Sequence, residues 1–400
     1  MIAPEGATGL LPGPRSGDGS SLQFGAVLAV LLVTGWVANH FVALMPTISD
    51  RQHLSTATLD AIFGIYAVGL LPGLLIGGRA SDAFGRQVVA LTGSATAVIG
   101  TVAMVLSQQP DVLLVGRLVV GVGVGLAMTS GTAWASDLRG PAGAATAGAV
   151  LITGFAIGPF AGGLIAGAGD SGVAASFALA AVLVVIAMVV TVLAARRTPP
   201  SSASLGVQQP VATDLSAGRA LSWAMPLAPW VFASATLGFI TIPARVHTGL
   251  AAPIAAGIAA LIVNGASGVI QIIARTGSWG PRAGTVGAAL AALGYALIAL
   301  APPTMTLTLA VPLLLALGCA SGLSLREGLI DLEAAAPQHV RGVLTGAFYA
   351  LTYIGFGLPL LLTTVGFSGG HIILAGMATI AASAAILRTL RLRRDSHRQS

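Results

Sequence analysis

Long apolar stretches separated by short polar ones run along almost the whole chain. A helix needs about 20 mostly apolar residues to cross a bilayer. In the first half such stretches cover residues 22–46, 57–78, 87–107, 111–135, 143–167 and 173–195. In the second half they cover residues 221–243, 251–274, 283–302, 306–328, 342–366 and 370–390. This pattern predicts an all-α membrane protein with about 12 transmembrane helices.

A polar segment rich in proline and serine divides the pattern into two halves. It covers residues 196–220 and has the composition of a linker. The first apolar stretch is too long for the core of a signal peptide, so we expect it to be retained as a helix. The predicted organisation begins with a cytoplasmic tail (1–21) and a six-helix bundle (22–195). The linker (196–220), a second six-helix bundle (221–390) and a basic cytoplasmic tail (391–400) follow.

The two halves repeat one another. The pattern Gly-x-x-x-Gly-Leu at 121–126, in the fourth predicted helix, recurs at 318–323 in the tenth, an offset of 197 residues. The same offset relates Pro46, which we expect to end the first helix, to Pro243, which we expect to end the seventh. These matches predict two pseudo-symmetric bundles.

Charge supports the membrane assignment and orients the chain. Only 8% of the residues are charged, against roughly 25% in a soluble domain. The positive charge comes from arginines; 15 of them fall in segments on one side of the predicted spans, and only Arg51 and Arg245 fall on the other. The positive-inside rule therefore places both termini in the cytoplasm. Because the arginines are scattered between apolar spans, we expect no nucleic-acid partner.

The loop after the second predicted helix has a defined spacing. It contains Gly78, three residues, Asp82, two residues, Gly85 and Arg86. Glycines allow a tight turn, and an acid beside arginines at a helix end can exchange partners between two conformations. The alternative interpretation is an ordinary basic turn.

The fourth and fifth predicted helices carry two further patterns. Arg117 lies inside the fourth span, where a charge costs about 2.5–3.5 kcal/mol on insertion scales. It therefore faces protein or water, unless it reaches the outer interface along its own alkyl chain. The fifth helix contains proline and glycines that predict a kink and close backbone contact. These residues are Gly154, Gly158, Pro159, Gly162 and Gly163.

These patterns resemble motifs of the major facilitator superfamily. The loop is similar to its signature loop, although Ala83 and Gln87 stand where the family usually has basic residues. The fifth-helix pattern is similar to the antiporter motif of the 12-helix drug:proton antiporters. The resemblance implies alternating access, a contact between Asp82 and the segment beginning at Gly342, and a role for Arg117 in proton transfer.

The first helix departs from that family because it lacks the family's acidic residue. Asn39 and His40 are the strongly polar side chains near its end. An imidazole titrates near physiological pH, so His40 is a candidate proton or substrate group. The alternative is a hydrogen-bonded packing residue.

In the tenth helix, Arg326 and Glu327 are adjacent and so point about 100° apart, which predicts a separate partner for each. Glu327 is the expected proton carrier, with His40 as its competitor and Arg117 and Arg326 as the modulating charges. The alternative for the Arg326–Glu327 pair is a cytoplasmic gate or an interfacial pair. Asp60, near the outer end of the second helix, is expected to be a solvated cap.

The resemblance implies a cavity lined by the first, fourth, seventh and tenth helices. The candidates for substrate contact are Trp36, Asn39, His40, Trp134, Trp230 and Glu327. We expect proton-coupled export of a small lipophilic or amphiphilic compound, with import of a polar metabolite as the alternative. A non-transporting scaffold or sensor is the more remote alternative. We expect no enzyme activity, no cofactor, a monomer, and protons, substrate and the bilayer of the inner membrane as partners.

Overall fold

The computed structural model describes residues 16–169, 171–196 and 216–399, and the side chains of all but a few of these. Most of the predicted N-terminal tail and linker therefore lie outside the described residues. The described chain is almost entirely helical, as predicted.

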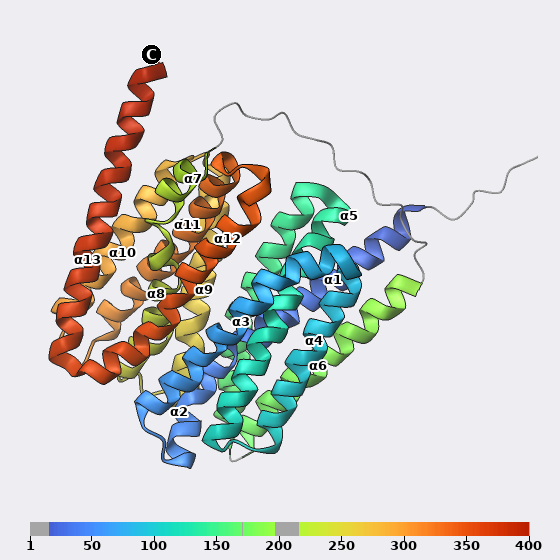
Figure 1. Ribbon diagram of the computed structural model, residues 1–400. Coiled ribbons are helices and arrows are strands. Elements are labelled where there is room, and N and C mark those ends of the chain that lie inside the picture. Colours follow the sequence, from blue (N-terminus) through green and yellow to red (C-terminus); the bar gives the residue numbers. More distant parts are fainter. Residues whose placement is uncertain (1–15, 170, 197–215, 400) are drawn as a thin grey trace, which may run out of the picture.

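The first half forms one bundle, drawn from blue to green in Figure 1. Its helices are α1 (Ser16–Asn39), α2 (Phe41–Gln52), α3 (Thr56–Phe84), α4 (Arg86–Leu106), α5 (Pro110–Ala166) and α6 (Gly172–Arg196). The backbone leaves helical geometry inside α5 at Arg139 and Gly140, so α5 contributes two spans, 110–140 and 142–166. Helix continues through Pro46 to Gln52, so the prediction that Pro46 ends the first helix was wrong.

The second half forms the other bundle, drawn from yellow-green to red in Figure 1. Its α-helices are α7 (Ala217–Ala224), α8 (Ala228–Thr236), α9 (Ala252–Thr276), α10 (Arg282–Leu300), α11 (Leu307–Ala335), α12 (Gln338–Tyr353) and α13 (Leu358–Gln399). A π-helix, η1 (Leu237–Thr241), and the 3₁₀ segments η2 (Pro243–Arg245) and η3 (Ile354–Gly357) interrupt them.

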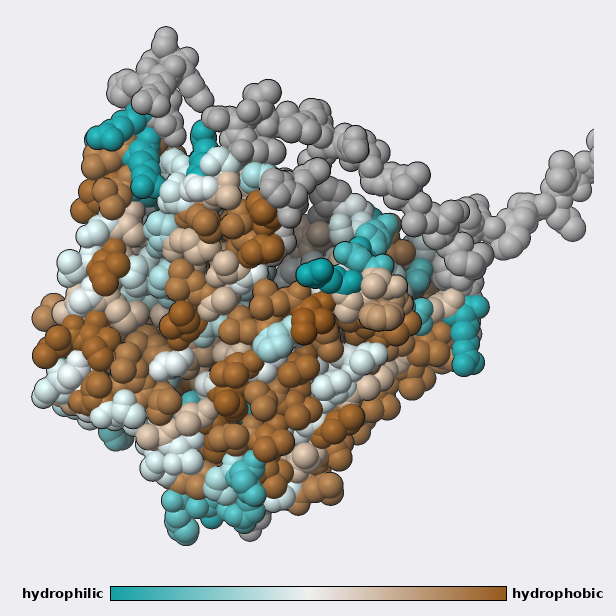
Figure 2. Space-filling model, in the orientation of Figure 1, coloured by the Kyte–Doolittle hydropathy of each residue, from teal (hydrophilic) through white to brown (hydrophobic). Residues whose placement is uncertain are grey.

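The described residues contain 11 stretches long and apolar enough to span a membrane. The last, Val343–Arg394, has 52 residues and breaks at Gly366, where φ is +70°. Since about 20 residues make one crossing, this stretch accounts for two, which gives the predicted twelve. On the face shown in Figure 2, a broad apolar region lies between polar residues at two opposite ends, as a bilayer requires.

The repeat seen in the sequence extends to helix contacts. A Cβ placed on Gly121 would collide with the backbone of Tyr66 in α3, and one on Gly318 would collide with the backbone of Val263 in α9. The offset of 197 relates Gly121 to Gly318, and it also relates their contact partners, Tyr66 and Val263. Such glycines let two helix backbones approach closely, which is how packing holds helices together in lipid. The two bundles are therefore built on the same internal contact.

The bundles lie side by side, and α1, α7 and the last turns of α13 mark one side of the pair (Figure 1). We call this the tail side. The predicted last helix ends at residue 390, whereas α13 stays helical to Gln399.

Candidate functional site

The hydrogen-bonding pattern of the first span changes at His40, between α1, which ends at Asn39, and α2, which begins at Phe41. His40 keeps helical dihedral angles, φ −59° and ψ −27°, and the span runs on as one helix to Gln52. The offset of 197 carries His40 onto Leu237, where α8 gives way to the π-helix η1. Local departures from regular α-helical hydrogen bonding are frequent at functional sites, and equivalent places in two repeats are where transporters bind substrate, near the bilayer midplane.

Asn39 completes a hydrogen bond that Pro159 removes. Proline has no N–H, so in α5 it cannot donate to the carbonyl of Phe155, four residues earlier. The Asn39 side-chain nitrogen donates to this carbonyl at 3.0 Å. A buried carbonyl needs such a partner. Helix α5 keeps helical dihedral angles through Pro159, so the proline does not break the helix. Asn39 thus ties the first span to the proline-containing helix.

The second bundle uses a similar arrangement. The hydroxyl of Thr236, which the offset relates to Asn39, lies 3.0 Å from the carbonyl oxygen of Gly355 and 2.8 Å from that of Phe232 in its own helix. Gly355 lies four residues before Pro359, the proline of the next span. Here the Leu358 amide also donates to the Gly355 carbonyl through the 3₁₀ turn. In each bundle, a polar side chain therefore contacts a carbonyl four residues before a proline of a neighbouring helix.

Arg117 lies beside the junction of α1 and α2 in the first span. Its side chain is 0% exposed, which rules out the interpretation that it reaches the outer interface. One guanidinium nitrogen donates to the carbonyl of Ala38 at 3.2 Å. The guanidinium carbon lies 4.3 Å from the ring centre of Tyr66 and 4.8 Å from that of Phe41. Arg117 makes no ion pair among the described residues, and two of its nitrogens lack a hydrogen-bond partner. A buried arginine held only by carbonyl and rings is a costly arrangement, typical of functional charges in membranes.

His40 is also fully buried. Its Nδ1 lies 3.1 Å from the carbonyl of Val37, and Nε2 has no partner. The ring packs edge-on against Phe177 of α6, with centroids 5.4 Å apart. His40 therefore points into its own bundle.

The proline-glycine pattern of α5 lies between two neighbours. A Cβ on Gly158 would come within 2.8 Å of the Cα of Trp36 in α1. On another side, a Cβ on Gly163 would collide with the carbonyl of Pro253, the second residue of α9 in the other bundle. A Cβ on Gly257 would lie 2.7 Å from the carbonyl oxygen of Pro159. The pattern thus permits a backbone-to-backbone seal between bundles, on the side opposite the tails.

A second contact between bundles contains a buried acid. Asp60 of α3 is 1% exposed, and it accepts a hydrogen bond of 2.6 Å from the Thr363 hydroxyl of α13. Its other carboxylate oxygen has no partner. Close by in the chain, Phe63 stacks on Phe356 of η3 with centroids 5.0 Å apart. The prediction of a solvated cap for Asp60 was wrong, because α3 turns this face toward the other bundle.

Glu327 lies inside the second bundle. It is 1% exposed, and a Cβ on Gly284 of α10 would lie 2.9 Å from its Cγ. The guanidinium of Arg326 lies 3.1 Å from it and that of Arg388 in α13 lies 3.7 Å away. The first pair contradicts the expectation that adjacent residues cannot meet, since two long side chains can bend toward each other across 100°. Asp331, which the sequence analysis did not single out, pairs with Arg388 at 2.7 Å.

Two of the predicted substrate-contact tryptophans are core residues. Trp134 is 6% exposed and packs with Phe24 and Leu31 in the first bundle. Trp230 is 3% exposed, and its ring lies 5.9 Å from that of Tyr295 in α10. Trp36 is half-buried at the contact with α5. The structure therefore brings together Trp36, Asn39, His40, Arg117 and Pro159, and leaves Trp134, Trp230 and Glu327 apart.

The glycine-acid loop forms an ion-pair cluster on the tail side. Arg86 pairs with Asp82, and its Nε donates to Asp137 of α5 at 2.9 Å. Gly85 has a φ of +93°, a conformation that glycine adopts without strain. The expected contact of Asp82 with the segment at Gly342 falls on side chains outside the described set.

The family model of the Major Facilitator Superfamily matches residues 26–360. The Multidrug resistance protein MdtL of Shigella flexneri serotype 5b (strain 8401) is 33% identical over 96 residues, and that of Escherichia coli (strain K12 / DH10B) is 32% identical over the same length. Each match spans only 24% of this chain and 24% of the relative.

Solved structures share the fold. A peptide transporter POT in complex with sulfate superposes with a TM-score of 0.76 at 13% identity, covering 93% of this chain and 94% of its own. The POT family transporter PepTSo gives 0.71 at 13% identity, covering 93% and 98%. The chain is a multi-pass membrane transporter that belongs to the Major Facilitator Superfamily.

Proposed function

We propose that this transporter exports a small lipophilic or amphiphilic compound in exchange for protons, by alternating access. The observation that carries the proposal is the seal made by α5. Gly158 meets α1 of its own bundle, while Pro159 and Gly163 meet α9 of the other. A tight seal on the side opposite the tails leaves loading to occur from the tail side. With the tails in the cytoplasm, as the arginine bias predicts, access in this conformation is from the cytoplasm. The outward direction is proposed from the similarity of the α5 pattern to the antiporter motif.

Proton coupling needs a titratable group whose surroundings change between states. Glu327 and Arg388 belong to one bundle, so their pairing is preserved when the bundles move as units. Asp60 instead lies in the contact that must open, and it faces Thr363 across it. Opening would exchange a dry surrounding for water. We therefore favour Asp60 over Glu327 and His40 as the proton carrier, with Arg117 as the charge beside the substrate path.

The energy available is adequate for such an exchange. For a neutral substrate, exchange with one proton moves one net charge, and about 100 mV then supplies about 2.3 kcal/mol. Since about 1.4 kcal/mol corresponds to a factor of ten, this supports a concentration ratio of roughly 50. For a monovalent cation, exchange with one proton moves no net charge, so the pH gradient alone drives it, by about a factor of ten per pH unit. No cofactor is needed, and a monomer suffices because both bundles come from one chain.

The proposed substrate class rests on the apolar residues where the two bundles meet. Aromatic and aliphatic side chains dominate the contact between bundles, including Phe63, Phe239 and Phe356. The MdtL relatives are multidrug resistance proteins by name, which agrees with a lipophilic substrate. One observation favours the alternative of a polar anion, namely the unused hydrogen-bond donors of Arg117. In this conformation, however, Arg117 is fully buried.

The cellular test compares bacteria with and without the gene. We expect the producing cells to tolerate higher concentrations of some lipophilic cations, such as ethidium, and to hold less of them. A protonophore should remove that difference, since it collapses the proton gradient. If the producing cells instead accumulate a polar metabolite, and tolerate no lipophilic compound better, import is the function.

A further inference from the structure

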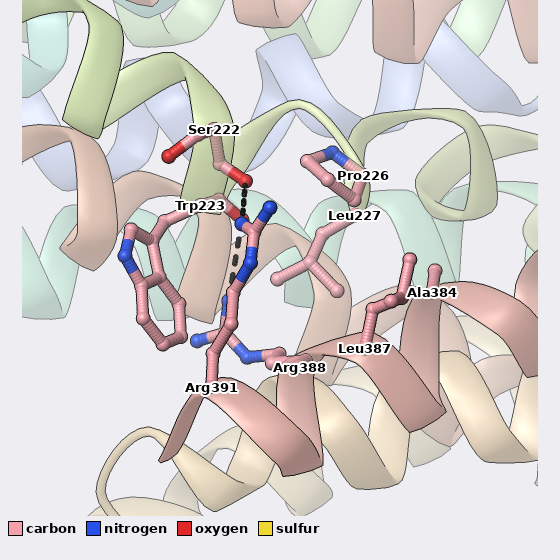
Figure 3. Close-up of a pocket in the computed structure, with 8 residues that line it drawn as sticks. All are labelled: Ser222, Trp223, Pro226, Leu227, Ala384, Leu387, Arg388 and Arg391. Atoms are coloured by element: carbon pink, nitrogen blue, oxygen red, sulfur yellow. Dashed lines mark hydrogen bonds between the residues drawn. The ribbon is translucent and has the colours of Figure 1, made fainter. Parts of the chain in front are cut away.

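A pocket between α7 and α13 lies apart from the site described above. It is open to solvent, and the space between its walls, solvent included, is about 350 Å³. Two arginines and a tryptophan line one part of it and apolar side chains line the rest (Figure 3): Arg388, Arg391, Trp223, Pro226, Leu227 and Leu387.

Arg388 provides a buried cationic wall. Its side chain is 5% exposed. One nitrogen, Nη1, donates to Asp331 at 2.7 Å and to the carbonyl of Trp223 at 3.2 Å. The other terminal nitrogen, Nη2, makes no hydrogen bond but pairs with Glu327 at 3.7 Å. Because this contact is longer than a hydrogen bond, Nη2 keeps donor capacity for an acceptor that comes within reach.

Arg391 provides a second cation at the mouth of the pocket. It is exposed and donates to the carbonyl of Ser222 at 2.9 Å. The guanidinium carbons of Arg388 and Arg391 lie 4.9 Å and 5.9 Å from the ring centre of Trp223. Behind the pocket, Arg388 pairs with Glu327 and Asp331, and Arg326 also pairs with Glu327. With Arg391 at the mouth, these three arginines exceed the two carboxylates by one positive charge.

The pocket lies at the level of lipid headgroups. Trp223 belongs to the first turns of the span Ala217–Arg245, and the two arginines belong to the last turns of Val343–Arg394. Tryptophan and arginine are typical of the membrane–water interface. Apolar side chains such as Leu387, which is 56% exposed, continue from the pocket toward the hydrocarbon.

We propose that this pocket binds a phosphate-bearing anion, with the phosphodiester of an anionic phospholipid as its occupant. Arginine recognises phosphate oxygens through paired, charge-assisted hydrogen bonds. Basic pockets between transmembrane helices on the cytoplasmic side bind anionic headgroups in the same way. Free inorganic phosphate offers the same oxygens without the acyl chains, which the apolar wall would contact.

The test measures ligand-dependent thermal stabilisation of the full chain purified in an uncharged detergent. Three probes are titrated: dioctanoyl phosphatidylglycerol, dioctanoyl phosphatidylcholine and inorganic phosphate. We expect saturable stabilisation by phosphatidylglycerol and much weaker binding of the other two. Stabilisation by inorganic phosphate, with competition against the lipid at similar affinity, would identify free phosphate as the occupant.

Variants locate the binding. Arg391→Ala should weaken the affinity for phosphatidylglycerol by roughly tenfold, the value of one charge-assisted hydrogen bond. Ala384 also lines the pocket (Figure 3). Ala384→Phe fills the apolar part and should weaken the affinity for the lipid without removing charge. Arg275→Ala, an exposed arginine at the end of α9 away from the pocket, is the control and should bind like the wild type. Equal phosphatidylglycerol affinity in the wild type, Arg391→Ala and Ala384→Phe would overturn the proposal.

Discussion

At the scale of residues, a polar side chain replaces a lost backbone partner. Asn39 supplies a donor for the Phe155 carbonyl that Pro159 leaves without its helical N–H. In the hydrocarbon of a bilayer no water is present to hydrogen-bond such a carbonyl. Arg117 adds a second contact to the same part of the first span, since it donates to the carbonyl of Ala38. Asn39 therefore joins the first span to the proline-containing helix.

Asn39→Ala tests this account. The change leaves the Phe155 carbonyl buried without a partner, so we expect the free energy of unfolding to fall by about 1–3 kcal/mol. Thermal unfolding in detergent measures the loss. Asn264→Ala is the matched control, because Asn264 donates at 2.9 Å to Ala260 of its own helix, a carbonyl that also has a helical amide partner. If both variants lose the same stability, Asn39 is an ordinary polar residue.

At the scale of elements, α5 belongs to two contacts at once. It packs on α1 through Gly154 and Gly158 and on α9 through Pro159 and Gly163. A rigid helix that touches both bundles can seal one end of the pair while the other end opens. The resemblance to an antiporter motif thus corresponds to a defined surface in this protein.

Gly158→Leu should abolish export while leaving membrane insertion normal. A side chain there meets the backbone of Trp36, and overpacking of this kind typically costs about 1–3 kcal/mol. Ethidium efflux from cells, at equal protein level in the membrane, is the measurement. Gly148→Leu in the same helix is the control, since nothing lies within 4 Å of a Cβ placed there. Normal efflux by Gly158→Leu would mean that the seal is unimportant.

At the scale of the molecule, the sequence was sufficient for the two-bundle architecture. Apolar length and the offset of 197 are local or periodic signals, and the contacts of Gly121 and Gly318 preserve that offset. Which face of a helix meets which neighbour is not a local signal. Asp60 was therefore missed at the contact between bundles, and Glu327 lies inside one bundle although a cavity position was expected.

The predicted orientation can be tested on the whole chain. Fifteen arginines on one side against two on the other predict that the tails lie inside the cell. Reporter fusions at the C-terminus and after Ser204 should both give a cytoplasmic signal. A periplasmic signal from either fusion would reverse the direction inferred for transport.

The central claim, outward transport coupled to protons, is tested most directly in inside-out membrane vesicles with an imposed pH gradient, acid inside. We expect vesicles with the wild-type protein to accumulate ethidium or another lipophilic cation from a test panel, and to stop when nigericin removes the gradient. Asp60→Asn should bind and exchange the compound but fail to concentrate it, whereas His40→Ala and Glu327→Gln should still concentrate it. Accumulation that persists without the pH gradient, or in Asp60→Asn, would contradict the account.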